Sequence, residues 1–160
     1  MSTNKRQIIF LRHAQSAEKQ AGQTDKQRAL TDHGIEQSLR VGNFLQKEKF
    51  NIDLILASSA IRTKTTAQLI ANTLNNIPPV HLIDEMYQAT VAQLAELIQD
   101  QEFDTALMVG HNPAISMIIT HFTSHEVYLT PAQGCLIEFS AGITRLDIRT
   151  GQWIRYIPEA

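Results

Sequence analysis

Short apolar runs alternate along the chain with longer segments in which apolar residues recur every three or four positions. The short runs have the length and composition of buried strands, and they are Gln7–Leu11, Leu54–Ala57, Val80–Ile83 and Thr105–Val109. The longer segments predict helices that begin at Thr31 or Asp32, run from Ala60 to about Leu74, cover Val91–Gln99 and follow Pro113 to about Phe122. Such an alternation is typical of a mostly parallel sheet with helices on both faces.

The end of the chain has a different pattern. Three short β-like runs follow one another there without an intervening helix, and they are Gly134–Phe139, Ile143–Ile148 and Gln152–Ile157. Ile143–Ile148 alternates apolar and polar residues, and Thr150-Gly151 is typical of a tight hairpin turn. The pattern therefore predicts a three-layer α/β/α sandwich whose mostly parallel central sheet ends in antiparallel C-terminal strands.

Three of the predicted strands lead into residues that are able to bind an anion. Arg12 and His13 follow the first strand, Arg62 lies just after the second, and His111 follows the fourth. Burying such groups without a partner is expensive, whereas the carboxyl ends of parallel strands are where α/β sheets bind ligands. We therefore expect these side chains to converge on one anion site, with His13 available for chemistry.

Two helix starts strengthen this expectation. Ser58 or Ser59 is a plausible N-cap for a helix that carries Arg62 in its first turn. Asn112 followed by Pro113 is typical of an N-cap and the first helical residue. Because helix N-termini present free amide groups and a positive dipole end, both junctions favour phosphate.

At this point the motifs resemble those of the histidine phosphatase, or phosphoglycerate-mutase-like, superfamily, and most closely its small bacterial branch of SixA-type phosphohistidine phosphatases. The motifs that carry the resemblance are Leu11-Arg12-His13-Ala14, Arg28-Ala29-Leu30-Thr31-Asp32-His33-Gly34, Ser58 to Arg62 continuing to Thr66-Ala67, and Val109-Gly110-His111-Asn112-Pro113. They occur in the family's order over roughly the first two-thirds of the chain, and together they are specific. The sequence departs from the family pattern at Ala14, where glycine is usual, and at Ser59, where proline is usual.

The resemblance implies a role for each matching residue. His13 would be the nucleophile that becomes transiently phosphorylated, while Arg12, Arg62 and His111 would hold the phosphoryl oxygens. Arg28 resembles the additional phosphate-binding arginine of the small branch. The arginines should lower the pKa of His13 and keep it neutral, and a backbone carbonyl bound to its other ring nitrogen would fix the tautomer. Because they also supply the positive charge, we expect neither a metal ion nor a cofactor.

A third departure concerns the general acid that mutases and phosphomonoesterases of this superfamily use to protonate the leaving oxygen. Alignment places Gln88 in that position, and Glu85 replaces it if the loop is shifted in register. An alkoxide needs the proton, whereas a protonated imidazole nitrogen leaves readily because its pKa is only ~6.5. The absence of the acid favours phosphohistidine, carried by a protein such as a histidine-containing phosphotransfer domain.

Two other functions stay open at this stage. A small-molecule phosphomonoesterase of the same superfamily would need a working acid and usually a lid, yet one helix and one strand fill the stretch between Glu85 and His111. A non-catalytic phosphate-binding module would lack a nucleophile, and His13 is present. His121 and His125 have a spacing that can bind metal, but we interpret them as surface residues.

Composition limits the remaining choices. The chain has 160 residues, is 43% hydrophobic and carries a net charge of −2, which suits one domain over residues 1–160 and argues against a nucleic-acid partner. No apolar stretch approaches the roughly 20 residues that span a bilayer. Residues 1–6 lack the apolar core of a signal peptide, and Cys135 is the only cysteine. We expect a cytoplasmic monomer without membrane contact.

Overall fold

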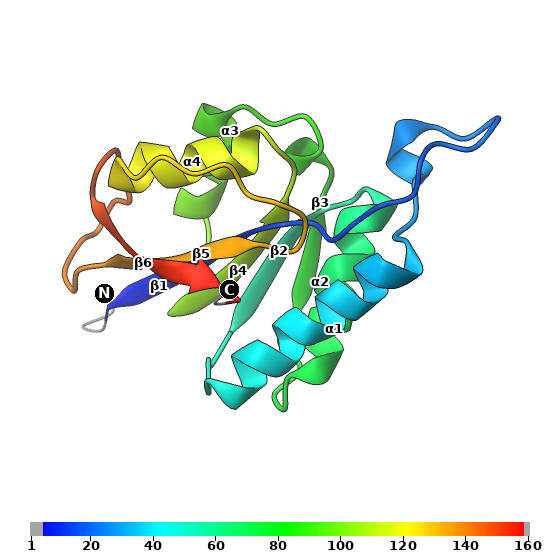
Figure 1. The fold of residues 1–160 in the computed structure, drawn as a ribbon. Coiled ribbons are helices and arrows are strands. Elements are labelled where there is room, and N and C mark those ends of the chain that lie inside the picture. Colours follow the sequence, from blue (N-terminus) through cyan, green and yellow to red (C-terminus); the bar gives the residue numbers. More distant parts are fainter. Residues whose placement is uncertain (1–4, 159–160) are drawn as a thin grey trace.

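The computed structural model describes residues 5–158 of the chain (Figure 1). Residues 1–4, part of the segment that argued against a signal peptide, lie outside the described residues. The strands are β1 (Arg6–Arg12), β2 (Leu54–Ser58), β3 (Val80–Ile83), β4 (Thr105–Gly110), β5 (Gly134–Phe139) and β6 (Gly151–Ile157). The helices are α1 (Asp32–Lys47), α2 (Ile61–Thr73), α3 (Val91–Gln99) and α4 (Ala114–Thr123), with short 3₁₀ turns η1 (Asp25–Gln27) and η2 (Asp84–Met86).

The strands form one mixed sheet in the order β3-β2-β4-β1-β5-β6. β3, β2, β4 and β1 are parallel, whereas β5 and β6 are antiparallel. The α1 and α2 helices cover one face of this sheet, and α3 and α4 cover the other (Figure 1). The predicted fold class is therefore confirmed.

The alternation of side chains along β1 explains why that run is apolar throughout. Ile8 and Phe10 point into the core beneath α3 and α4, while Ile9 and Leu11 point into the core beneath α1 and α2. All four are 1% exposed or less. A strand that is covered on both faces needs a continuous apolar run, which is why the sequence pattern located it correctly.

The predicted strand at Ile143–Ile148 and the hairpin at Thr150-Gly151 are both wrong. The segment that joins β5 to β6 is instead an irregular loop, and β6 begins at Gly151. Leu146 is fully buried in the core and Ile143 packs against it in part, whereas Ile148 is 58% exposed. A local turn replaces the strand, because the Thr150 amide donates to the Asp147 carbonyl at 3.1 Å and the Thr150 hydroxyl bonds the same carbonyl at 2.6 Å.

No helix among residues 5–158 combines the length and the apolar character that crossing a membrane requires.

Candidate active site

The sheet order brings the predicted site residues together at the carboxyl-terminal ends of the parallel strands. β4 lies between β1 and β2, and these strands are paired in parallel, so their carboxyl ends are neighbours. Arg12 pairs in register with Gly110, which places the residues that follow each of them side by side. The imidazole rings of His13 and His111 are accordingly 5.3 Å apart, centroid to centroid.

His13 is held as a neutral imidazole. Its side chain is nearly buried, and its Nδ1 lies 2.7 Å from the carbonyl oxygen of Ala14. Because a carbonyl only accepts, Nδ1 carries the proton and donates it to this bond, which leaves the lone pair on Nε2. The pKa of His13 is lowered to about 4, mainly because burial disfavours the charged ring; the bond to Ala14 opposes the shift, and the arginine charges add to it. Burial, rather than the arginines, is thus the leading cause.

His111 is neutral for the same reason. Burial, followed by the charge of Arg62, lowers its pKa to about 3. Its Nε2 is 2.9 Å from the hydroxyl oxygen of Ser58, the last residue of β2. The ring of Tyr87 contacts the His111 ring edge-on, with centroids 5.5 Å apart. Two uncharged imidazoles therefore lie beside the arginine side chains.

The three arginines are anchored to the protein, and in two of them the Nε nitrogen has no hydrogen-bond partner among the described residues. Arg12 donates from Nη1 to the Leu129 carbonyl at 3.1 Å, and Arg28 donates from Nε to the Ala17 carbonyl at 2.9 Å. Arg62 is 6% exposed. Within the described part of the chain, the buried Nε atoms of Arg12 and Arg62 have no hydrogen-bond partner. Buried guanidinium donors without a partner are costly, so the arrangement favours an anion between them.

The helix starts differ from the predicted caps by one or two residues. Ala60, and neither Ser58 nor Ser59, is the N-cap of α2, which still places Arg62 in the first turn. The Ser58 hydroxyl instead accepts from the Ala60 amide at 3.3 Å and contacts His111. Ser58, at the end of β2, thus contacts a residue that follows the neighbouring strand β4. Helix-capping rules consider only residues that are close in the sequence, so they do not predict this contact.

At the start of α4 the N-cap is Pro113, not Asn112, and the peptide bond between them is cis. The Asn112 side chain accepts from the Ser116 hydroxyl and donates from Nδ2 to the Leu129 carbonyl at 2.8 Å. The same Leu129 carbonyl accepts from Arg12. Asn112 therefore organises the loop that anchors Arg12 instead of capping the helix.

Asp25 and Tyr87 are part of the site, and the sequence interpretation missed both. The Asp25 carboxylate accepts from Arg28 Nη1 at 3.0 Å and from Arg62 Nη2 at 2.9 Å. It also accepts from the Tyr87 hydroxyl, which comes from the segment after β3. The β1–α1 loop thus reaches across the site to the β3–α3 connection. The one available signal was that Asp25 lies three residues before Arg28.

A pocket of about 210 Å³ opens beside His111, between the β3–α3 and β4–α4 connections. Gln88 lines it together with Tyr87 and His111, whereas Glu85 lies on exposed η2 and does not contribute to the wall. Among its lining residues there is no Lys, Arg, Asp or Glu. The structure therefore brings Gln88, and not Glu85, to the pocket.

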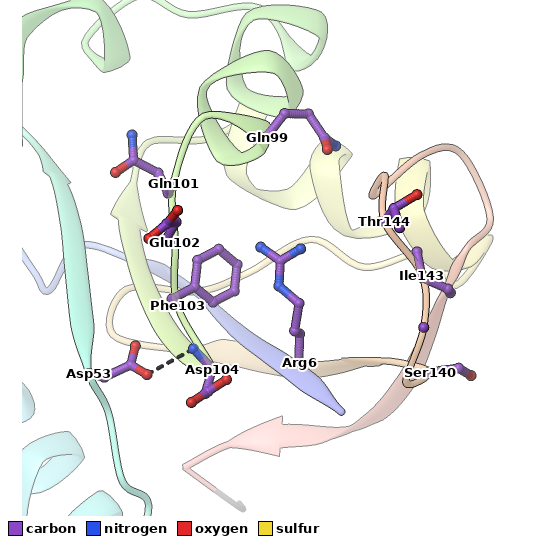
Figure 2. Close-up of a pocket in the computed structure, with 11 residues that line it drawn as sticks. Arg6, Asp53, Gln99, Gln101, Glu102, Phe103, Asp104, Ser140, Ile143 and Thr144 are labelled. Atoms are coloured by element: carbon purple, nitrogen blue, oxygen red, sulfur yellow. Dashed lines mark hydrogen bonds between the residues drawn. The ribbon is translucent and has the colours of Figure 1, made fainter. Parts of the chain in front are cut away.

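A larger hollow of about 580 Å³ lies at the opposite, amino-terminal end of the parallel strands (Figure 2). Arg6 points into it, with the guanidinium carbon 4.4 Å from the centre of the Phe103 ring. Acidic residues, Asp53 and Glu102, line the same hollow. Neither His13 nor His111 is among its lining residues, so the larger hollow is separate from the histidine pair.

Among residues 5–158, no group of three or more His, Cys, Asp or Glu side chains is placed to hold a metal ion. His125 stacks on Trp153 with ring centroids 4.2 Å apart, and His121 packs edge-on against Phe122. Each of these two histidines therefore packs against an aromatic ring of its own.

Known proteins resemble this chain in sequence and in fold. The sequence profile of the histidine phosphatase superfamily (branch 1) matches residues 8–87, half of the chain. Phosphohistidine phosphatase SixA of Escherichia coli (strain K12) is 22% identical over 124 residues, which cover 75% of this chain and 76% of that protein.

Two solved structures show how widely the fold is used. The structure of a protein histidine phosphatase SixA complexed with tungstate superposes with a TM-score of 0.81 at 19% identity, covering 94% of this chain and 96% of that one. A phosphoserine phosphatase mutant from Entamoeba histolytica in complex with phosphoserine gives 0.68 at 17% identity, covering 96% and 97%. Since proteins named for different substrates share this fold, it does not by itself identify a substrate. Because the profile matches half of its length, this chain belongs to branch 1 of the histidine phosphatase superfamily.

Proposed function

We propose that the chain removes the phosphoryl group from phosphohistidine on a protein, and that His13 carries this group as an intermediate. The observation that carries the proposal is the hydrogen bond from His13 Nδ1 to the Ala14 carbonyl. Because Nδ1 carries the proton, Nε2 keeps an unshared electron pair in a buried site. At the same site, the Nε donors of Arg12 and Arg62 have no partner within residues 5–158. A neutral nucleophile beside fixed cationic donors suits phosphoryl transfer, which depends on positioning and charge stabilisation.

The reaction proceeds in two displacements. In the first, His13 Nε2 forms a bond to phosphorus while the bond from phosphorus to the substrate nitrogen breaks. The substrate ring carries a proton on its other nitrogen, so it leaves with the electron pair of the broken bond as neutral imidazole. In the second, water attacks phosphorus and the bond to His13 Nε2 breaks. Both protons of the water stay on the product, which leaves as dihydrogen phosphate while His13 returns to neutral imidazole. Arg12, Arg28, Arg62 and His111 hold the phosphoryl oxygens during both steps.

The pocket beside His111 supports an imidazole leaving group. It contains no carboxylic acid to protonate an alkoxide and no charged residue to pair with a charged leaving group such as serine or glycerate. An imidazole nitrogen needs neither, because its conjugate acid has a pKa of only ~6.5. The similarity to a phosphohistidine phosphatase of Escherichia coli points to the same class of substrate.

The test is a comparison of kcat/KM on a phosphohistidine-carrying protein with kcat/KM on small phosphate monoesters, each with and without a chelator. We expect the phosphohistidine protein to be preferred and the chelator to have no effect. The exposed Glu85→Gln variant serves as a control that should leave both activities unchanged. Preference for a monoester together with its loss in Glu85→Gln would make Glu85 the acid. Binding of phosphate without any turnover would instead indicate a non-catalytic module.

A further inference from the structure

Among residues 5–158, Asp25 is the one carboxylate that forms ion pairs with the arginines of the site. It begins η1 in the loop between β1 and α1, and its side chain remains 48% exposed. Its Oδ1 accepts from Arg28 at 3.0 Å, and its Oδ2 accepts from Arg62 at 2.9 Å and from the Tyr87 hydroxyl. The hydrogen bond from Tyr87, followed by those from Arg28 and Arg62, holds the pKa of Asp25 well below its ordinary value. The carboxylate is therefore ionised whenever the site is at neutral pH.

The way Asp25 binds Arg62 leaves one side of the guanidinium group unused. Arg62 Nη1 donates to the Asp25 backbone carbonyl at 2.8 Å, while Nη2 donates to its carboxylate at 2.9 Å. Both contacts are at the outer end of the planar fork. The Nε atom, on the other side, is buried and has no partner among the described residues. Asp25 thus fixes the plane of Arg62 without occupying the edge formed by Nε and the second Nη2 hydrogen.

Arg28 is held in the same manner. Its three nitrogens donate to the Ala17 carbonyl, the Ser16 hydroxyl and the Asp25 carboxylate. Asp25 is the only one of these partners that also binds Arg62, so it sets the relative placement of the two guanidinium groups. The Tyr87 hydroxyl fixes Asp25 from the opposite side of the site, and the Tyr87 ring lies edge-on to His111.

We infer that Asp25 is a positioning residue, which orients Arg28 and Arg62 so that their free N–H groups face the phosphoryl group. The inference rests on the proposed phosphoryl site. Positioning and a simple charge effect predict opposite changes in anion affinity when the Asp25 charge is removed. A carboxylate close to an anion site repels phosphate, so the charge effect alone would tighten anion binding. Positioning predicts weaker binding after the same change, because each arginine loses the partner that fixes its orientation.

The experiment compares the dissociation constant for vanadate in the wild type, Asp25→Asn and Asp84→Asn. Asparagine keeps the shape of aspartate but removes its charge. Asp84 is a matched control, because it is an exposed carboxylate on nearby η2 that pairs with Lys26 and with none of the site arginines. We expect Asp25→Asn to weaken vanadate binding about tenfold or more, and Asp84→Asn to change it by less than about twofold.

A spectroscopic signature separates positioning from a general loss of structure. In the wild type, vanadate should shift a slowly exchanging Arg62 Nε–H signal in the NMR spectrum, and in Asp25→Asn that signal should be broadened and insensitive to vanadate. The melting temperature of Asp25→Asn should stay close to that of the wild type, since Asp25 is half exposed on a loop. Equal or tighter vanadate binding by Asp25→Asn would overturn the inference. Failure of the wild type itself to bind vanadate would instead overturn the proposed function.

Discussion

At the scale of single residues, the site depends on keeping two histidines uncharged beside three cations. Burial lowers the pKa of His13 to about 4 and that of His111 to about 3. At neutral pH both rings are therefore uncharged, although they lie among guanidinium groups that never lose their charge. A neutral His13 is a nucleophile, whereas its protonated form would be inert. The low pKa is thus a requirement of the proposed chemistry and a consequence of the fold.

Arg62→Lys tests whether the planar fork, rather than charge alone, holds the phosphoryl group. Lysine keeps the charge, but it has no second and third nitrogen with which to hold both Asp25 and a phosphate. We expect kcat/KM on a phosphohistidine protein to fall about 100-fold or more, the usual cost of losing one stabilising donor. Arg40→Lys, at an exposed position on α1, is the control and should retain wild-type activity. Full activity of Arg62→Lys would show that a point charge is sufficient.

At the scale of elements, close contact between a helix start and the segment after β1 fixes the environment of His13. Gly34 lies in the first turn of α1, and a Cβ built there would be 2.1 Å from the Gln15 carbonyl oxygen. That carbonyl also accepts from the Thr31 amide at 3.1 Å. Gln15 directly follows Ala14, the partner of His13 Nδ1. Because Gly34 has no side chain, the start of α1 can lie against the Gln15 carbonyl. The position of Ala14, the residue before Gln15, therefore depends on this contact.

Gly34→Ala should reduce stability and activity together. The added methyl group forces α1 away from the segment after β1, and overpacking of this kind costs about 1–3 kcal/mol. We expect a lower free energy of unfolding in urea and a lower kcat/KM, since the carbonyl that orients His13 moves with Gln15. Glu36→Ala, at an exposed position of the same helix, should have little effect on either quantity. Unchanged stability of Gly34→Ala would show that the helix start adapts freely.

The limits of the sequence interpretation are also clearest at the element scale. Strands that are buried on both faces, and polar residues at their ends, could be located because each signal is contained within a few neighbouring residues. The irregular loop before β6 was misinterpreted because Ile143–Ile148 alternates like a strand, although only Leu146 is fully buried. Asp25 was missed because its partners, Arg62 and Tyr87, are 37 and 62 residues away in the chain. Contacts of this kind become visible only when the loops are placed in space.

At the scale of the whole molecule, two neutral histidines, His13 buried and His111 partly buried, make stability depend on pH. In the unfolded chain, a histidine takes up a proton below about pH 6.5, whereas folded His13 stays neutral until pH approaches 4. The unfolded state therefore binds more protons between these values, and stability falls as pH decreases through this range. Asp25 contributes to the pH dependence of stability only below about pH 4, because above this value its carboxyl group is ionised in the unfolded chain as well.

We expect the free energy of unfolding to decrease between pH 7.5 and pH 5, with His13 accounting for about 2 kcal/mol of the loss and His111 for a similar amount. The measurement is urea denaturation at the two pH values. His13→Ala, which lacks one of the two groups, should show a smaller loss than the wild type. If the two proteins lost the same stability, His13 would have an ordinary pKa in the folded state.

The central claim is that the phosphoryl group passes through Nε2 of His13. The most direct measurement mixes the enzyme rapidly with a ³²P-labelled phosphohistidine protein, quenches at high pH where phosphohistidine survives, and locates the label by mass spectrometry. We predict transient phosphorylation of His13, and neither labelling nor turnover in a folded His13→Ala variant. Stable labelling of another residue, or turnover by His13→Ala at the wild-type rate, would contradict this account of the site.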